Sequence, residues 1–131
     1  MADRILVWYF PDGLAPGDNQ GPTYELDADY APVRFWVKAR TSFVRASVPA
    51  FLVVATDVLS LDIDYEYEGT TTSIFTTPLP GLQNGSIVGE RDYFADPRLM
   101  KQGGLVKFNV DEVGPNGSGT GFTVQLELVR V

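Results

Sequence analysis

The sequence contains neither cysteine nor histidine. Without cysteine it can form no disulfide, no thiolate nucleophile and no thiolate metal site. Without histidine it lacks the commonest general base and the commonest transition-metal ligand, so a Ser–His–Asp or Cys–His catalytic arrangement is excluded. We therefore expect a protein that is not an enzyme and that uses no metal or other cofactor.

Positive charge is also scarce. Ten Lys and Arg stand against 17 Asp and Glu, which gives a net charge of −7 at pH 7. Nucleic acids and anionic lipid surfaces repel such a chain, so we expect neither as a partner. No apolar run approaches the roughly 18 residues that a membrane-spanning helix needs. The N-terminus, MADRILVWYFPDG, lacks the plan of a signal peptide, which predicts synthesis in the cytoplasm.

Strict alternation marks the first half of residues 59–75, LSLDIDYEYEGTTTSIF. Apolar and aromatic residues alternate here with carboxylates: Leu61, Ile63, Tyr65 and Tyr67 against Asp62, Asp64, Glu66 and Glu68. A period of two predicts a strand with one buried and one solvated face, followed by a turn at Gly69 and a threonine-rich strand to residue 77. Alternate residues of a strand lie about 7 Å apart, too far to share one Ca²⁺, so we interpret the carboxylate row as a solvated face.

Further strands are predicted at 5–10, 23–30, 33–44, 50–58, 105–113 and 122–131. In the third of these, Val33, Phe35 and Val37 are expected inside. The last two strands flank the glycine-rich GPNGSGTG at 114–121, which we interpret as a hairpin tip. Proline- and glycine-rich loops are predicted at 11–22 and 78–89.

One helix signal is present, in residues 94–104, FADPRLMKQGG. Asp96 suits a cap, Pro97 the first helical position and Gly103 the C-terminal end. With the strands, this predicts a single all-β domain over 1–131. Its expected architecture is an antiparallel β-sandwich of jelly-roll type with one short helical turn.

The N-terminal strand reads ILVWYF without alternation, a pattern typical of a strand buried on both faces. A sandwich core covers one face only, so the other face is covered either by a partner or by the rest of the chain. We interpret 1–22, its first strand and loop, as an interface arm. The expected interface residues come from this arm and the second loop: Ile5, Val7, Trp8, Tyr9, Phe10, Leu14, Leu82 and Ile87.

Trp36 stands among three cations, Arg34, Lys38 and Arg40, at outward positions of the 33–44 strand. One interpretation is a platform on which a sugar or a cation stacks. The other is that the aliphatic stems of the cations cover the ring.

The second half of the chain resembles a β-sandwich module of tailed-bacteriophage virion proteins. The similarity rests on FLVVATDVLSLDIDYEYEG (51–69), TSIFTTPLP (72–80), VKFNVDEVG (106–114) and GSGTGFTVQLELV (117–129). It departs from the module's pattern where YEGTT replaces the usual Asn-Gly turn, and in the loop after Val-Gly. The resemblance implies a structural or adhesive module with no catalytic residues, and for a free-standing copy a capsid cement protein.

The resemblance thus implies a virion location on the outer capsid surface. The expected partners are the major capsid protein and copies of the chain itself, in a dimer or trimer, with loops 11–22 and 78–92 at the contacts. The alternative function is a carbohydrate-binding module of a tail fibre or baseplate, which would use Trp36. A third hypothesis, a small hydrolase, has no support in the spacing of the carboxylates.

Overall fold

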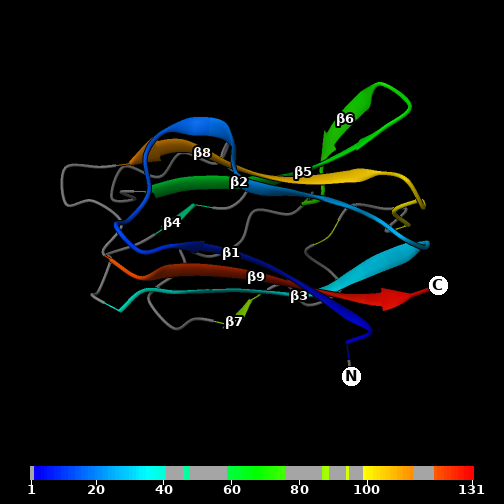
Figure 1. Ribbon diagram of the computed structural model, residues 1–131, viewed down its shortest axis with the longest axis horizontal. Coiled ribbons are helices and arrows are strands. Elements are labelled where there is room, and N and C mark those ends of the chain that lie inside the picture. The colour runs from blue at the N-terminus through cyan, green and yellow to red at the C-terminus, as the bar shows by residue number, and fades with distance from the viewer. Residues whose placement is uncertain are drawn as a thin grey trace.

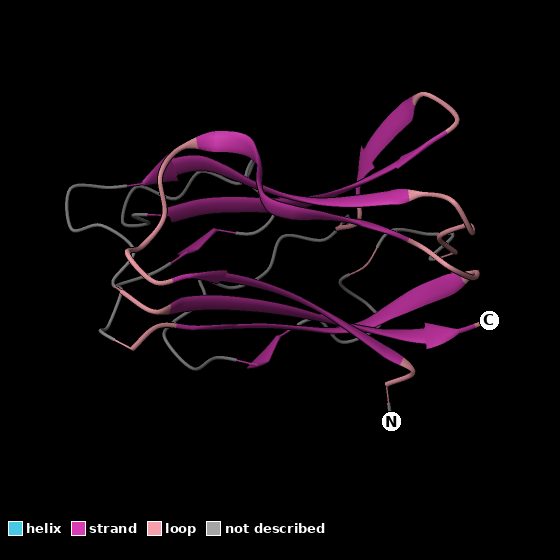
Figure 2. Ribbon diagram, in the orientation of Figure 1, coloured by secondary structure: helices cyan, strands magenta, loops and turns pink. Residues whose placement is uncertain are grey.

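The protein is a sandwich of two β-sheets that enclose one hydrophobic core (Figure 1). The structure is a computed structural model and describes residues 2–40, 46–47, 59–75, 87–88, 94, 99–113 and 120–131. These ranges contain no helix, and so none that is able to cross a membrane (Figure 2). The predicted all-β sandwich is confirmed, whereas its jelly-roll type stays a prediction.

Sheet A, the lower layer of Figure 1, contains four strands. In spatial order they are β1 (Arg4–Phe10), β9 (Phe122–Arg130), β3 (Tyr30–Lys38) and β7 (Ile87–Val88). Every neighbouring pair in this sheet is antiparallel. The first and last long strands of the chain therefore lie side by side, with β1 at one edge of the sheet.

Sheet B, the upper layer, is built on β2 (Gly17–Glu25), β8 (Leu105–Val113) and β5 (Leu59–Tyr67). Along the other edge of β5 lie β4 (Ala46–Ser47), which is parallel to it, and β6 (Thr70–Ser73), which is antiparallel. The strands β1, β2 and β3 alternate between the two sheets, as do β7, β8 and β9. Such alternation makes most connections cross from one layer to the other.

The core contains the inward residues that alternation predicts for four strands. Fully buried side chains come from both sheets: Phe35, Val37, Leu61, Ile63, Val106, Phe108, Val124 and Leu126. The apolar face of each strand is removed from water, which drives the packing of the layers. One position differs, because a bulge between Pro32 and Arg34 leaves Val33 only partly buried.

The predicted hairpin between 105–113 and 122–131 is wrong. Both segments are strands with the expected buried faces, but β8 lies in sheet B between β2 and β5, whereas β9 lies in sheet A between β1 and β3. Alternation defines which side of a strand meets the core and says nothing of its partner. The connection at 114–121 is long enough to cross between layers.

The predicted loop at 11–22 is also wrong in its second half, because β2 begins at Gly17. This edge strand is irregular, with register shifts on both sides of Gln20. Asn19 and Gly21 take left-handed φ angles of 56° and 69°. Glycine and asparagine tolerate such angles, so the composition that predicted a loop instead builds a bulged strand. The strand ends at Glu25, short of the predicted residue 30.

The helix predicted at 94–104 is absent from its described residues, 94 and 99–104. Met100 instead exchanges two main-chain hydrogen bonds of 2.7 and 2.8 Å with Tyr30. Gly103 lies in a turn, where its φ is 85°. The short strand β7 lies within the predicted loop at 78–89. The strand expected at 50–58, the positions 95–98 and Leu82 lie outside the described residues.

Candidate functional site

The N-terminal strand β1 is buried on one face and exposed on the other. Leu6 and Trp8 point into the core and are fully buried, whereas Ile5 and Tyr9 are 50% and 57% exposed. The single chain therefore leaves the outward face of β1 exposed, and coverage of that face by a partner stays a prediction. The outward residues of this strand happen to be apolar, and that hides the alternation in the sequence.

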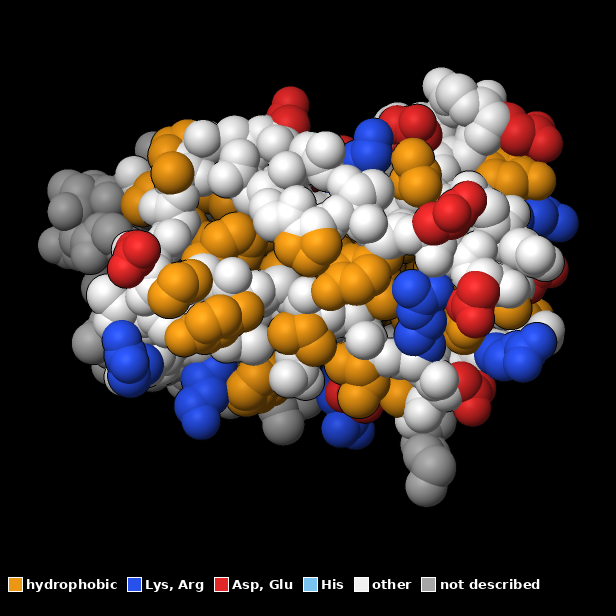
Figure 3. All heavy atoms as spheres, viewed as in Figure 1, with side chains coloured by type: hydrophobic (Ala, Val, Ile, Leu, Met, Phe, Trp, Pro, Cys, Tyr) orange, Lys and Arg blue, Asp and Glu red, His pale blue; other side chains and the backbone are white. Residues whose placement is uncertain are grey.

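A band of apolar side chains follows the edge of the sandwich between β1 and β2 (Figure 3). Each of these strands is the edge strand of its sheet, and the two edges lie beside each other. We assign six exposed or partly buried residues to this band, which we call the edge patch. Three are on the outward side of β1, and three are partly buried residues that pack against the core beside it: Ile5, Val7 and Tyr9, and Phe10, Leu14 and Tyr24. The edge patch contains five of the eight residues predicted for an interface.

The other three predicted interface residues do not belong to the edge patch. Trp8 is a core residue, and its Nε1 donates a 2.7 Å hydrogen bond to the carbonyl of Pro22. Its ring meets that of Tyr24 edge-on, with centroids 5.3 Å apart. Ile87 is in β7, at the opposite edge of sheet A, and Leu82 lies outside the described residues.

The outer face of sheet A presents three rows of side chains across β1, β9 and β3. The rows, read from the strand register, are Ile5–Glu127–Arg34, Val7–Gln125–Trp36 and Tyr9–Thr123–Lys38. Each strand contributes one residue to every row. The three residues from β1 are apolar, the three from β9 are polar, and those from β3 are one tryptophan and two cations. On the other side of β3, Ile87 of β7 is the register partner of Trp36.

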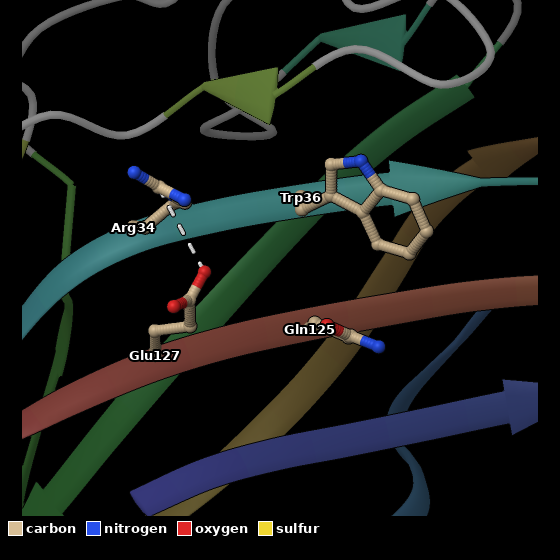
Figure 4. Close-up of a pocket in the computed structure, with 4 residues that line it drawn as sticks. All are labelled: Arg34, Trp36, Gln125 and Glu127. Atoms are coloured by element: carbon tan, nitrogen blue, oxygen red, sulfur yellow. Dashed lines mark ion pairs between the residues drawn. The ribbon is translucent and has the colours of Figure 1, made fainter. Parts of the chain in front are cut away.

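Trp36 lines two open hollows on this face, and Figure 4 shows the residues of the smaller one. The smaller, of about 180 Å³, is lined by Arg34, Trp36, Gln125 and Glu127. The larger, of about 630 Å³, is lined by Trp36, Lys38, Ala39, Arg40, Gly121, Thr123 and Gln125. In Figure 4 the broad side of the indole ring is turned toward the viewer above β3. The ring is only partly buried, so the aliphatic stems of its neighbours do not cover it fully.

The polar groups beside Trp36 are weakly engaged. The Arg34 Nε lies 3.8 Å from a Glu127 carboxylate oxygen, an ion pair without a hydrogen bond (Figure 4). The Arg34 side chain is 56% exposed. Gly121 has a φ of 62°, and a Cβ there would lie 3.0 Å from the Arg40 Cβ. Glycine at this position thus keeps the strand ends close at one end of the larger hollow.

Sequence reasoning found one column of this face and missed its neighbour. Arg34, Trp36 and Lys38 share one side of β3, as predicted, whereas Arg40 follows the end of the strand at Lys38. The polar column on β9 was recognised as outward, but nothing connected Gln125 with Trp36. These residues are 89 positions apart, and only the β3–β9 pairing makes them neighbours.

A second polar surface lies on the outer face of sheet B. Asp62 accepts hydrogen bonds from the Ser73 hydroxyl at 2.6 Å and from the Ile63 amide at 2.8 Å. Asp64 accepts one at 2.6 Å from the Asn109 side chain, whose oxygen accepts a bond from the Asn19 amide. The predicted solvated row is thus partly a hydrogen-bonded network that joins β6, β5, β8 and β2. Glu68, expected in the row, is in the turn with a φ of 50°.

Burial raises the pKa of Asp62 to about 6, although the hydrogen bond from Ser73 opposes the shift. Burial likewise raises the pKa of Asp64, against the hydrogen bond from Asn109. Among the described residues, no group of three or more side chains is arranged to hold a metal ion. The network therefore has a clear structural role in holding the bulged β2, and the outer face of sheet A is the better candidate for binding.

Together, the fold and these surfaces define a small all-β sandwich with an apolar edge and a separate polar face around a tryptophan. Comparison of the chain with protein-family models, with curated proteins and with solved structures found no match.

Proposed function

We propose that this chain is a structural protein of a bacteriophage virion, a capsid cement protein without enzymatic activity. The observation that carries the proposal is the edge patch. It holds Ile5 and Tyr9, each at least half exposed, in one band with partly buried aromatic residues. Contiguous exposed apolar surface on a small sandwich is typical of a protein–protein contact.

Three other features support this function. The phage-module resemblance covers the strands that build much of the sandwich, β5, β8 and β9. The alternation of strands between the layers is also what a jelly-roll requires, and jelly-rolls are frequent in viral capsid domains. The net charge of −7 suits a position outside the shell, away from packaged DNA.

In this proposal the edge patch binds the major capsid protein, and copies of the chain associate as a dimer or trimer on the outer capsid surface. Each contact buries a modest area. Many such contacts on one lattice act together, because neighbouring sites raise the effective concentration for one another. The sandwich then stabilises the shell by bridging capsomers.

Co-sedimentation of the purified protein with empty capsid shells of the parent virus tests the proposal. We expect saturable binding at a lattice stoichiometry, with the oligomeric state of the free protein measured by light scattering. The double variant Ile5→Ser/Tyr9→Ser should lose most of this binding. Val131→Ser removes another exposed apolar side chain, 76% exposed, from outside the edge patch and should bind normally. Absence of saturable binding by the native chain would refute the cement function.

A second candidate function, carbohydrate binding on a tail fibre or baseplate, is favoured by one observation. Trp36 is partly exposed between two hollows that polar side chains line. An aromatic ring beside a few convergent polar groups is the usual composition of a small-ligand site. This surface is on β3 and β9, so the two functions use different residues.

A further inference from the structure

The hollows beside Trp36 are rich in positive charge, in contrast to the chain as a whole. Their lining contains three cations, Arg34, Lys38 and Arg40, and one carboxylate, Glu127. The full chain has a net charge of −7. A local excess of cations on an acidic protein makes this surface a better binding site for an anionic ligand than the other surfaces of the chain.

The donors here are available to a ligand. Within the described part of the chain, the only polar interaction of the Arg34 side chain is its 3.8 Å contact with Glu127. The same part of the structure gives no hydrogen bond to the side chains of Lys38, Arg40 or Gln125, or to the Trp36 Nε1. Exposed guanidinium groups without a bidentate partner are suited to planar carboxylates.

The indole contributes a flat apolar surface between these polar groups (Figure 4). One side of a pyranose ring presents mainly C–H groups, which pack on an aromatic face, and its rim presents hydroxyls. The Gln125 amide, the Thr123 hydroxyl and the Glu127 carboxylate can exchange hydrogen bonds with such hydroxyls. Arg34 to Lys38 spans about 13 Å of β3, and Arg40 lies beyond the end of the strand, which leaves room for more than one sugar ring.

We propose that the outer face of sheet A around Trp36 binds an acidic saccharide, with a sugar ring stacked on Trp36 and carboxylates paired with Arg34, Lys38 or Arg40. This inference rests on the second candidate function and is independent of the cement function. Single-stranded nucleic acid also combines stacking with negative charge. The Glu127 carboxylate inside the site can accept hydrogen bonds from the hydroxyls around a sugar ring, donors that a DNA backbone lacks, so it disfavours single-stranded DNA.

Isothermal titration calorimetry with tri-galacturonate tests the proposal, with its methyl ester as a matched neutral ligand. Because the hollows are open, we expect a dissociation constant of about 0.1–1 mM for the acid. The ester should bind at least severalfold more weakly. Trp36→Ala should weaken binding of the acid about tenfold or more. Arg40→Gln should weaken it severalfold, while Lys101→Gln, an exposed cation on another surface, should leave it unchanged.

Each outcome is decisive. Equal affinity for acid and ester would overturn the pairing with carboxylates and leave carbohydrate binding in place. Failure of both ligands to bind, or binding that survives Trp36→Ala, would overturn the site itself. An oligothymidylate that binds more tightly than tri-galacturonate would assign the surface to nucleic acid instead. Circular dichroism of each variant separates loss of the site from loss of the fold.

Discussion

The hydroxyl of Tyr24 donates a hydrogen bond to the main-chain carbonyl of Val7, which joins the edge strand β2 of sheet B to the edge strand β1 of sheet A. The Trp8 indole makes a second such tie, to the carbonyl of Pro22. Edge strands present unpaired peptide groups and invite unwanted pairing. These two bonds satisfy carbonyls at that edge and hold the layers together beneath the edge patch.

Tyr24→Phe is expected to lower the free energy of unfolding by about 1 kcal/mol. This is the usual net contribution of one hydrogen bond, and the substitution leaves the Val7 carbonyl without its donor. Chemical denaturation measures the change. Tyr9→Phe is the matched control, because Tyr9 is 57% exposed on the neighbouring strand. It should change stability by less than about 0.5 kcal/mol. Equal effects of the two variants would show that the Tyr24 bond contributes nothing.

The raised pKa of Asp62 predicts that the stability of the protein depends on pH. Its folded pKa of about 6 lies above its ordinary value of 3.8, so the folded state binds its proton more tightly than the unfolded state does. The resulting stabilisation is complete below about pH 4 and is lost as the pH rises through 6. Asp62→Asn keeps an oxygen that accepts the Ser73 hydrogen bond and removes the pH-dependent loss, so it should stabilise the protein at pH 7 by roughly 3 kcal/mol.

Unfolding measured between pH 4 and pH 7 checks this prediction. The advantage of Asp62→Asn over the native chain should grow as the pH rises. Asp12→Asn, which removes an exposed carboxylate in the turn after β1, should show no comparable trend. A constant difference across the range would mean that Asp62 is not appreciably desolvated.

Gly103 and Gly104 each need to be glycine, but for different physical reasons. A Cβ at Gly104 would lie 2.3 Å from a ring carbon of Tyr65, whereas one at Gly103 would meet open space. Gly104→Ala should destabilise the protein by about 1–3 kcal/mol through overpacking. Gly103→Ala should cost about 1 kcal/mol because its φ is 85°.

Combining each substitution with Tyr65→Ala separates the two causes by denaturation. The cost of Gly104→Ala should largely disappear in that background, since the clash is gone. The cost of Gly103→Ala should persist, and Gly103→Asn should be milder because asparagine tolerates the left-handed region. Persistence of the full Gly104→Ala cost would exclude the clash with Tyr65 as its source.

The two tryptophans of the chain should differ in access to solvent. Trp8 is fully buried, whereas Trp36 is partly exposed beside the hollows. Acrylamide should therefore quench the fluorescence of the native protein readily and that of Trp36→Phe severalfold less. Denaturant should restore quenching in the variant. Strong quenching of folded Trp36→Phe would contradict the burial of Trp8.

Local pattern was sufficient for much of this fold. Alternation along 59–67 and 122–131 identified both strands and their buried faces, because successive side chains of a strand must point to opposite sides. It failed for Ile5 and Tyr9, whose apolar character at outward positions makes β1 look buried on both faces. It failed also for β2, where Asn19 and Gly21 build bulges from residues typical of loops.

Long-range pairing had no local signal. The segment of Met100 carries helix caps, but two hydrogen bonds to Tyr30 hold it extended. The strands β8 and β9 are consecutive and carry matching patterns, yet they lie in different sheets. The same is true of the candidate sites, since Gln125 reaches Trp36 only through the β3–β9 register.

The residues alone decide that this chain is all-β, acidic and without thiol or imidazole chemistry, and which side of most strands meets the core. These properties depend on composition and on neighbours two positions apart. Which strands pair, and therefore where Tyr24 meets Val7 and Gln125 meets Trp36, is decided only when two sheets close over one core. Many pairings bury the same apolar faces, and the connections between layers together with the bulges select one of them.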